Sequence, residues 1–239
     1  MIEFKITIAS FDVYPNSTVK PSALQRYMQQ AAREDCDNLG VTYPAMRAAN
    51  MVFVMTKLGL DIYSPIFAHD EIILKTYNNR IFGVTFEREF EFLREGKKVA
   101  HATTQWVIVK YDDRRIVRPK DFPFEIPAHN YETASIDLPR TLVGENVIAE
   151  SERVVRLSDL DENDHLNNCV YSDIAMDIIP FDRKNNYVSS VRVIFRQEAR
   201  IDQKLKLTLS ADESGYIATA VNATEDKPCF DSKYTLGEF

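Results

Sequence analysis

The sequence predicts an α+β fold built from two similar units, and three observations lead to this prediction. Each half of the chain contains one amphipathic helix followed by segments rich in β-branched and aromatic residues. The same plan of strand, turn, helix and antiparallel strands occurs twice, and the two helices align at an offset of about 146 residues. Four prolines lie between the copies, in a stretch with little hydrophobic periodicity. The copies share a pattern but few identical residues.

The first unit is expected within residues 1–118. A strand over 3–13 leads through the turn "YPNSTVKP" into a helix over 21–39, which Pro21 begins and Gly40 ends. One face of this helix carries Leu24, Tyr27, Met28, Ala31 and Leu39. Strands are then predicted for 51–63, 70–79, 83–95 and 98–112.

The strand over 83–95 alternates cleanly between apolar and acidic side chains. Its apolar face carries Val84, Phe86, Phe90 and Phe92, and its other face carries Glu87, Glu89 and Glu91. This alternation predicts antiparallel strands with one face packed on a core and one face in water.

Residues 119–148 are predicted to form a linker or a wrapping segment, and the second unit is expected within residues 149–239. A strand over 150–158 and a polar turn over 159–166 precede a helix over 168–179, which Pro180 ends. The strands that follow are expected at 187–200, 203–211, 215–223 and 228–236.

The composition excludes several classes of function. The net charge of −7 makes nucleic acid a poor partner, because phosphate binding needs a basic surface. Seven glycines and no GxGxxG or GxxxxGK[ST] argue against a nucleotide-binding loop. No CxxC, HExxH or other Cys/His cluster occurs, so we expect neither a metal nor a cofactor.

The cellular setting is also suggested by the sequence. No apolar run approaches the roughly 20 residues that span a bilayer, and the first residues lack the basic and apolar regions of a signal peptide. Three cysteines at unrelated spacings suit a reducing compartment. We therefore expect a cytoplasmic protein without a membrane span.

The stretch "DENDHLNNCVY" (161–171) is the main candidate for a functional site. The corresponding turn of the first unit has no acid and no histidine, and a turn needs neither in order to bend. If residues 161–165 are extended, Asp161, Asn163 and His165 point to one side, beside the N-terminus of a helix that offers N–H donors. The alternative is structural: Asn167 or Asn168 caps the helix and an aspartate forms an Asx turn.

Three segments together resemble the acyl-ACP thioesterases, the plant and bacterial enzymes of fatty-acid synthesis. "DENDHLNNCVY" is similar to their Asp-x-Asn-x-His-x-Asn-Asn signature. "ATTQWVIVKYDDRR" (102–115) resembles a segment of their first half, and "VRVIFRQEAR" (191–200) resembles a strand that ends in Arg-x-Glu. The resemblance implies a tandem double hotdog fold, in which an antiparallel sheet wraps a central helix in each unit.

By position, the resemblance implies a catalytic set of Asp161, Asn163, His165 and Glu198. A cysteine often follows the glutamate in that family, whereas this chain has Ala199, so a thiol nucleophile at that position is excluded. Hydrolysis of a thioester then needs an activated water or a carboxylate that attacks directly. We expect Asp161 or Glu198 to be the general base, and both assignments stay open. Cys169, at the start of the helix, is expected to pack in the core.

The first unit would hold the acyl chain. Its expected lining is the helix face with Leu24, Tyr27, Met28 and Ala31, together with Trp106, although plain core packing also explains these residues. The basic cluster Arg114, Arg115, Arg118 and Lys120 would steer an acidic acyl carrier protein, unless it is simply a solvated face.

Other functions stay open on the sequence alone. A coenzyme A thioesterase would use similar chemistry on a smaller carrier, and a dehydratase of 3-hydroxyacyl chains would leave the thioester intact. A non-catalytic acyl-binding module would bind without turnover. Chain length, saturation preference and the choice between monomer and homodimer are not determined.

Overall fold

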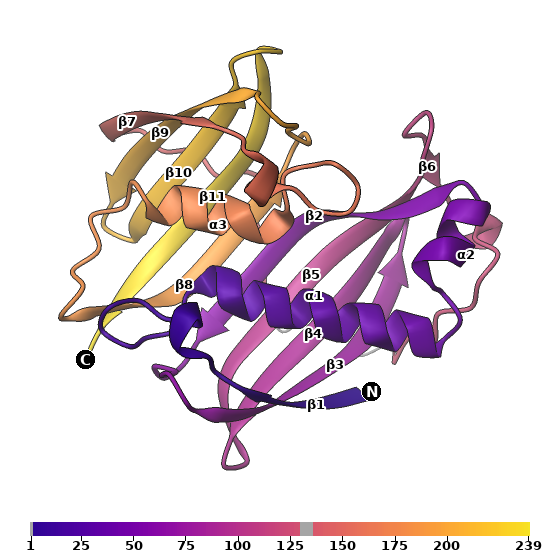
Figure 1. Cartoon of the computed structure of the whole chain (residues 1–239), viewed down its shortest axis with the longest axis horizontal. Helices are drawn as coiled ribbons and strands as arrows, with labels where there is room; N and C mark the ends of the chain where they lie inside the picture. The colour runs from indigo at the N-terminus through magenta and orange to yellow at the C-terminus, as the bar shows by residue number, and fades with distance from the viewer. Residues whose placement is uncertain (1, 130–135) are drawn as a thin grey trace.

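Eleven strands form one antiparallel sheet in the computed structural model, which describes residues 2–129 and 136–239 (Figure 1). The strands of the first unit are β1 (Ile2–Thr7), β2 (Met51–Ile62), β3 (Glu71–Phe82), β4 (Thr85–Arg94), β5 (Lys97–Lys110) and the short β6 (Ile116–Val117), which pairs with β5. Those of the second unit are β7 (Val147–Val154), β8 (Asn186–Phe195), β9 (Lys204–Asp212), β10 (Gly215–Asn222) and β11 (Lys227–Glu238). The predicted α+β class with two copies of one plan is confirmed.

The two units meet in the middle of this sheet. The strand order is β1-β3-β4-β5-β2-β8-β11-β10-β9-β7, so the second strand of each unit lies at the junction and the first at an outer edge. β2 and β8 pair antiparallel from Lys57 opposite Ile194 to Asp61 opposite Ser190. Across this junction the guanidinium of Arg192 donates to both carboxylate oxygens of Asp61, at 2.8 and 3.1 Å. The units therefore share one hydrogen-bonded ladder.

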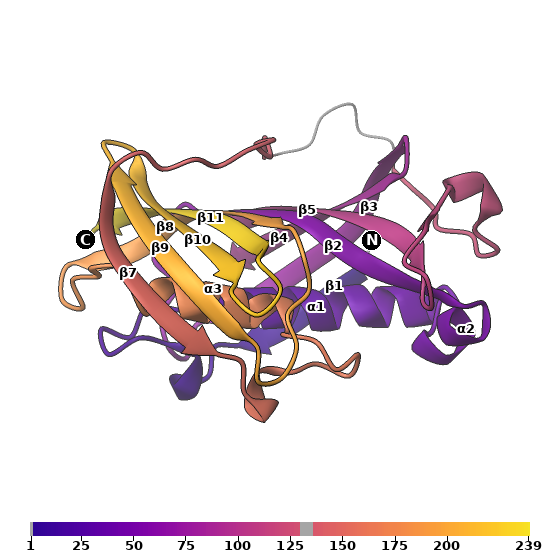
Figure 2. The same cartoon turned by 90° about the horizontal axis from the view of Figure 1, so that it is seen from above.

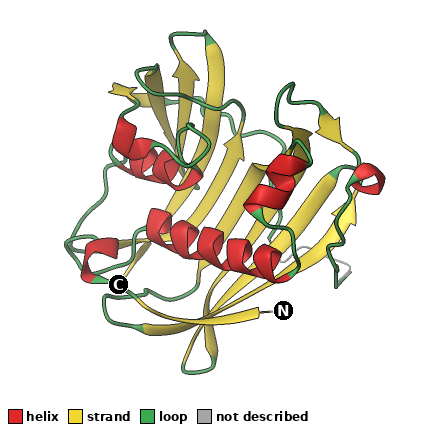
Figure 3. Ribbon diagram, turned by 45° about the vertical axis from the view of Figure 1, so that its right-hand side comes forward, coloured by secondary structure: helices red, strands yellow, loops and turns green. Residues whose placement is uncertain are grey.

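Helices α1 (Pro21–Asn38) and α3 (Asn168–Met176) lie on the same side of the sheet, one over each half (Figure 3). Three of the four residues predicted for the inner face of α1 near its start, Leu24, Met28 and Ala31, are at most 2% exposed. The helices meet where the Gln25 amide and the Ser172 hydroxyl exchange hydrogen bonds of 2.8 and 3.1 Å. This buried polar contact aligns the two units.

The short helix α2 (Tyr43–Ala48) was not predicted from the sequence. Thr42 caps it by accepting a hydrogen bond from the Ala45 N–H at 3.3 Å, and Pro44 occupies its first turn. Three single turns of 3-10 helix occur at Ser10–Asp12, Pro119–Asp121 and Leu157–Asp159. The first of these shows that the strand predicted over 3–13 is too long.

The strand predicted over 187–200 is also too long, and this difference matters for the site. β8 ends at Phe195 because the N–H groups of Arg196 and Gln197 both turn to the carbonyl of Cys229, which ends the ladder. Glu198 therefore lies in a loop after the strand and not in the strand itself.

The prediction of a solvated outer face on β4 is wrong for two of its three glutamates. Glu87 and Glu89 are each 1% exposed. Glu87 accepts hydrogen bonds from Asn79, Arg80 and Gln105, and Glu89 accepts one from Thr103 at 2.7 Å and lies 2.6 Å from a ring nitrogen of His101. These ion pairs and hydrogen bonds offset the free-energy cost of burying two carboxylates.

The described residues on both sides of 130–135 lie against this outer face, opposite the helices (Figure 2). The N–H of His129 donates to the carbonyl of Asn78 at 3.0 Å, and Ile136 is 2% exposed. A Cβ at Gly59 in β2 would lie 2.6 to 2.7 Å from the side chains of Leu138 and Ile136, so a larger residue would displace the segment. Residues 130–135 of the predicted linker lie outside the described residues.

Two properties bear on the class of protein. Over residues 2–129 and 136–239, no helix has both the length and the apolar character needed to cross a bilayer. Within the same ranges, no group of three or more His, Cys, Asp or Glu side chains is arranged to hold a metal ion.

Candidate active site

The polar stretch of the second unit forms a tight turn that leads into α3. The N–H of Asp161 donates to the carbonyl of His165 at 2.8 Å, and Oδ1 of Asp161 accepts the N–H groups of Asn163 at 2.8 Å and His165 at 3.3 Å. Asp164, at the tip, has a positive φ of 62°. Residues 161–165 are thus not extended, but the turn still places the side chains of Asp161, Asn163 and His165 on one cavity wall.

Glu198 joins this turn from the loop after β8. The N–H of Leu166 donates to the carbonyl of Ala199 at 2.8 Å, which fastens the loop to the turn. Oε2 of Glu198 then lies 3.2 Å from Nε2 of His165. The structure brings all four predicted catalytic residues to the same cavity. Ala199 is fully buried.

Arg114 comes to this site from the first unit, although we predicted it to bind a partner at the surface. Its NH2 group donates to Oε2 of Glu198 at 2.7 Å and lies 3.5 Å from Nε2 of His165. Its side chain is 35% exposed and lines the cavity. No pattern in the sequence predicts this contact, which joins residues 84 positions apart.

Tyr43, the first residue of α2, also reaches the site from the first unit. Its hydroxyl donates to Oδ1 of Asn163 at 3.1 Å. The guanidinium groups of Arg33 and Arg47 lie over its ring, 5.3 and 5.9 Å from the centroid. With Oδ1 occupied, the amide nitrogen of Asn163 is the atom left to donate to a substrate oxygen.

His165 is held in an environment that favours its neutral form. Burial lowers the pKa of His165 below its ordinary value of 6.5; Glu198 raises it, and the positive charges of Arg114 and Arg200 lower it. The net effect is a lowered pKa, so the imidazole is neutral at pH 7 and can accept or donate one hydrogen bond.

The start of α3 completes the wall of the site. Asn167 is the helix cap, since its Oδ1 accepts the N–H of Cys169 at 2.9 Å, and Asn168 lines the cavity as the first helical residue. Cys169 packs in the core, as predicted, with no exposed surface, and burial raises the pKa of its thiol to about 12. A thiolate nucleophile at Cys169 is therefore disfavoured.

Two neighbouring cavities share lining residues at the turn. The cavity around Asp161, His165 and Glu198 has a volume of about 140 Å³. A second cavity of about 440 Å³ lies in the first unit and shares Asp161, Asn163 and Asn168 with it. Apolar side chains of the larger cavity come from α1, the loop after it, α2, the sheet and the segment after β6: Ala32, Val41, Met46, Met51, Val52, Phe53, Phe86, Trp106 and Ile126. Its volume is in the range of small-molecule sites, about 300–1,000 Å³.

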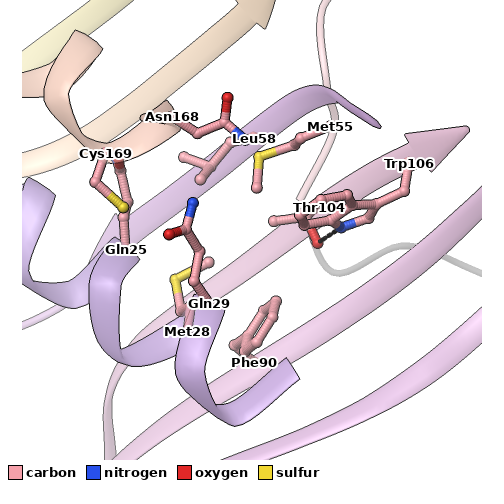
Figure 4. A pocket seen from close by; sticks show the side chains of 10 residues that line it. All are labelled: Gln25, Met28, Gln29, Met55, Leu58, Phe90, Thr104, Trp106, Asn168 and Cys169. Carbon is pink, nitrogen blue, oxygen red and sulfur yellow. Dashed lines mark hydrogen bonds between the residues drawn. The ribbon is translucent and has the colours of Figure 1, made fainter. Parts of the chain in front are cut away.

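The predicted chain-binding residues divide into two groups. Met28 and Trp106 line a small space of about 10 Å³ between α1 and the sheet (Figure 4), and Trp106 also lines the larger cavity. Ten cubic ångströms is about one water, so this part of the unit is filled by its own side chains. Leu24 and Ala31 are buried in the core, and the Tyr27 hydroxyl donates to Asp12 at 2.7 Å; none of the three lines the cavities described here.

The rest of the predicted basic cluster lies near the surface. Arg115 is 80% exposed and pairs with Asp113, and Arg118 is 64% exposed and pairs with Asp121. Lys120 is exposed. These three side chains lie at the surface, whereas the guanidinium of Arg114 contacts Glu198 in the cavity wall.

The corresponding turn of the first unit has the same backbone but different side chains. The N–H of Tyr14 donates to the carbonyl of Thr18, as Asp161 does to His165, and Ser17 has a φ of 65°, as Asp164 has 62°. Asn16 lies at the position of Asn163, but its Oδ1 accepts hydrogen bonds from Thr18. The turn is thus a property of the fold, and the acid and the imidazole are additions of the second unit.

Comparison with known proteins agrees with this layout. Residues 1–124 match the family model of the acyl-ACP thioesterase N-terminal domain, and residues 145–235 match that of the C-terminal domain. Oleoyl-acyl carrier protein thioesterase 2, a chloroplastic protein of Arabidopsis thaliana, is 20% identical over 245 residues, which cover 92% of this chain. The alignment spans 65% of the plant protein, so the chain accounts for just under two thirds of that relative.

Solved structures show the same fold over nearly the whole chain. An acyl-ACP thioesterase from Bacteroides thetaiotaomicron superposes with a TM-score of 0.88 at 15% identity, covering 99% of this chain and 97% of the other. A 12:0-ACP thioesterase from Umbellularia californica gives 0.83 at 16% identity, with 100% and 97% covered. The tandem double hotdog fold is confirmed.

Proposed function

The chain belongs to the acyl-ACP thioesterase family, and from this premise we propose that it hydrolyses the thioester of fatty acyl chains on acyl carrier protein, releasing a free fatty acid. One observation supports the proposal most directly. A cavity lined by an acid, an amide, an imidazole and a second acid shares lining residues with a larger, mainly apolar cavity beneath α1. The first suits a thioester and the second suits an acyl chain.

We assign the role of general base to Glu198. The carboxylate of Asp161 is tied by Oδ1 to the backbone of its own turn, whereas Glu198 contacts the side chains of His165 and Arg114. Glu198 removes a proton from water as the water oxygen attacks the carbonyl carbon. The C–S bond then breaks, and the proton passes to the leaving thiolate, so that thioester and water become carboxylic acid and thiol.

Asn163 stabilises the charge that develops on the carbonyl oxygen. Its amide nitrogen donates to the oxyanion, since Tyr43 occupies its oxygen. His165, neutral and 3.2 Å from Glu198, orients that carboxylate and relays the proton. Asp161 shapes the turn that carries both residues.

The carrier is recognised outside the cavity. The acyl carrier protein is acidic, and the exposed residues Arg115, Arg118 and Lys120 give this acidic chain a local positive surface beside the hairpin that carries Arg114. Such a surface speeds association more than it strengthens the bound complex.

The test is release of thiol from a series of acyl carrier protein thioesters with chains of roughly 8 to 18 carbons, using the wild type and Glu198→Gln. We expect the wild type to release thiol and Glu198→Gln to be slower by about 100-fold or more. Asp161→Asn should lose less, because its amide oxygen can still accept the turn N–H groups. Glu213→Gln removes the same charge from an exposed turn and is the control that should behave like the wild type.

Further arms of the assay separate the alternatives. Hydrolysis of palmitoyl-coenzyme A as fast as the carrier-protein ester would favour a coenzyme A thioesterase. Water loss from 3-hydroxyacyl chains without thiol release would identify a dehydratase. Binding of acyl carrier thioesters without turnover would identify a non-catalytic module, and either of the last two results contradicts the proposal.

A further inference from the structure

Arg114 belongs to the first unit, where its guanidinium lies 5.8 Å from the ring centroid of Tyr111, yet it also reaches Glu198 and His165 of the second unit. It follows β5 in the β5–β6 hairpin, where its N–H donates to the carbonyl of Lys110 at 3.1 Å and the N–H of Lys110 donates to the carbonyl of Arg115 at 2.8 Å. From this hairpin its NH2 group reaches Oε2 of Glu198 at 2.7 Å and lies 3.5 Å from Nε2 of His165. One guanidinium therefore faces both groups that handle the proton.

The backbone of Arg114 is unfavourable for an arginine. Its φ is 58°, in the left-handed region that suits Gly, Asn and Asp. Of the eight non-glycine residues with positive φ among the described residues, four are Asn or Asp. A hairpin position that would accept glycine at lower cost thus carries a long cation, which points to a use for the side chain.

The charges around His165 show what that use is. Glu198, Arg114, Arg200 and Asp161 are the charged groups that act on the imidazole; the carboxylates raise its pKa, and the two arginines, with burial, lower it. Of the two arginines, Arg114 also donates a hydrogen bond to Glu198. It therefore offsets part of the effect of Glu198 on the pKa of His165 while it holds that carboxylate in position.

We propose that Arg114 is a positioning residue, supplied by the first unit, that orients Glu198 toward the cavity and adds to the effect of burial in favouring the neutral form of His165. This inference rests on the proposed function, and it gives the first unit a part in the chemistry beyond holding the acyl chain. It also replaces the surface docking role that we predicted for Arg114 from its basic neighbours.

The kinetic test uses Arg114→Gln and Arg114→Lys on the acyl carrier protein thioester that the wild type hydrolyses fastest. We expect Arg114→Gln to lower kcat by roughly 10- to 100-fold with KM little changed, because a misplaced carboxylate slows the chemical step and not carrier binding. The acid limb of its pH–rate profile should move to higher pH, since the imidazole loses a positive neighbour. Arg114→Lys keeps the charge, so its acid limb should stay near that of the wild type.

Arg114→Gly separates positioning from folding. It removes the side chain and relieves the left-handed backbone, so its unfolding temperature should equal or exceed that of the wild type while its kcat falls as far as that of Arg114→Gln. Arg183→Gln, an exposed arginine in the loop before β8, is the control and should change neither kcat nor the pH profile. An increase in KM for the carrier with normal kcat would overturn the inference and restore the docking role.

A measurement without turnover tests the inference independently of the proposed function. NMR titration of the four histidines, with His165 assigned by a His165→Asn variant, gives the pKa of His165 directly. We expect that pKa to be higher in Arg114→Gln than in the wild type, and an unchanged value would overturn the inference. If the wild type releases no thiol but the pKa of His165 is higher in Arg114→Gln than in the wild type, the proposed function is refuted and the assignment of Arg114 still stands.

Discussion

At the scale of single residues, the proposed mechanism depends on the orientation of the Asn163 amide, whose nitrogen would donate to the oxyanion. The Tyr43 hydroxyl donates to Oδ1 of Asn163 at 3.1 Å, from a residue 120 positions away. Without that donor the amide is free to turn its oxygen toward the substrate carbonyl, where two acceptors would repel each other.

Tyr43→Phe should therefore lower kcat by about 3- to 10-fold, the worth of one hydrogen bond of about 0.5–1.5 kcal/mol. KM should not change, because the ring stays between Arg33 and Arg47. Steady-state kinetics and thermal unfolding of both proteins check this. A variant with normal kcat would show that the amide is held by other contacts.

The neutral state of His165 predicts a pH dependence of both rate and stability. Its pKa in the folded chain is below 6.5, so the unfolded chain binds the proton more readily at pH values between the folded pKa and 6.5. Stability therefore falls as the pH decreases through this window, and turnover falls as the imidazole is protonated. His165→Asn should reduce the loss of unfolding temperature between about pH 8 and about pH 5.5. An identical loss in the variant would contradict the lowered pKa.

Part of the site could be predicted from residues and part could not. The excess of acid, amide and imidazole over what a turn needs identified Asp161, Asn163 and His165, and the Arg-x-Glu resemblance added Glu198. The contact between Arg114 and Glu198 could not be predicted, because the two residues lie 84 positions apart. A cluster of basic side chains is typical of an exposed surface, which is where we predicted Arg114. No sequence pattern indicated that Tyr43 belongs to the site, because its hydrogen-bond acceptor Asn163 lies 120 positions away.

At the scale of elements, the size of the cavity under α1 should set the preferred chain length. Ala32 on α1 lines this cavity, so Ala32→Leu would fill part of it. We expect the preferred chain to shorten by roughly two carbons, as each buried CH₂ group contributes about 0.8 kcal/mol. Gln30→Leu adds the same side chain to the exposed face of α1 and should leave the preference unchanged. Competition assays with mixed chain lengths measure both, and an unaltered preference in Ala32→Leu would place the acyl chain elsewhere.

Long periodic elements were predictable, and short or covered ones were not. α1 and the strands have enough residues for their period to show, whereas α2 has six residues, fewer than two full turns. The acidic face of β4 alternates as a solvated face does, but partners on β3 and β5 pair with Glu87 and Glu89. Such pairing depends on strand register, which alternation alone does not give.

At the scale of the whole molecule, the β2–β8 ladder and the contact between Gln25 and Ser172 join the two units. We expect the chain to unfold in one cooperative transition, because separating the units would leave a long sheet edge and a buried polar pair exposed. Trp106, the only tryptophan and part of the first unit, reports that unit by fluorescence, and circular dichroism reports the whole sheet. The two midpoints in denaturant should coincide, and a fluorescence midpoint that differs from the dichroism midpoint would contradict this.

The placement of both hotdog units in one polypeptide removes a constraint that symmetry imposes. In a homodimer of identical units, every substitution occurs in both copies. A change that enlarges the pocket of one copy therefore also alters the equivalent position beside the catalytic turn of the other copy. Here Asn16 and Asn163 occupy equivalent positions but can mutate separately, as can the cavity under α1 and the turn before α3. Such a chain can change the lining of the larger cavity one mutation at a time while the turn before α3 stays intact.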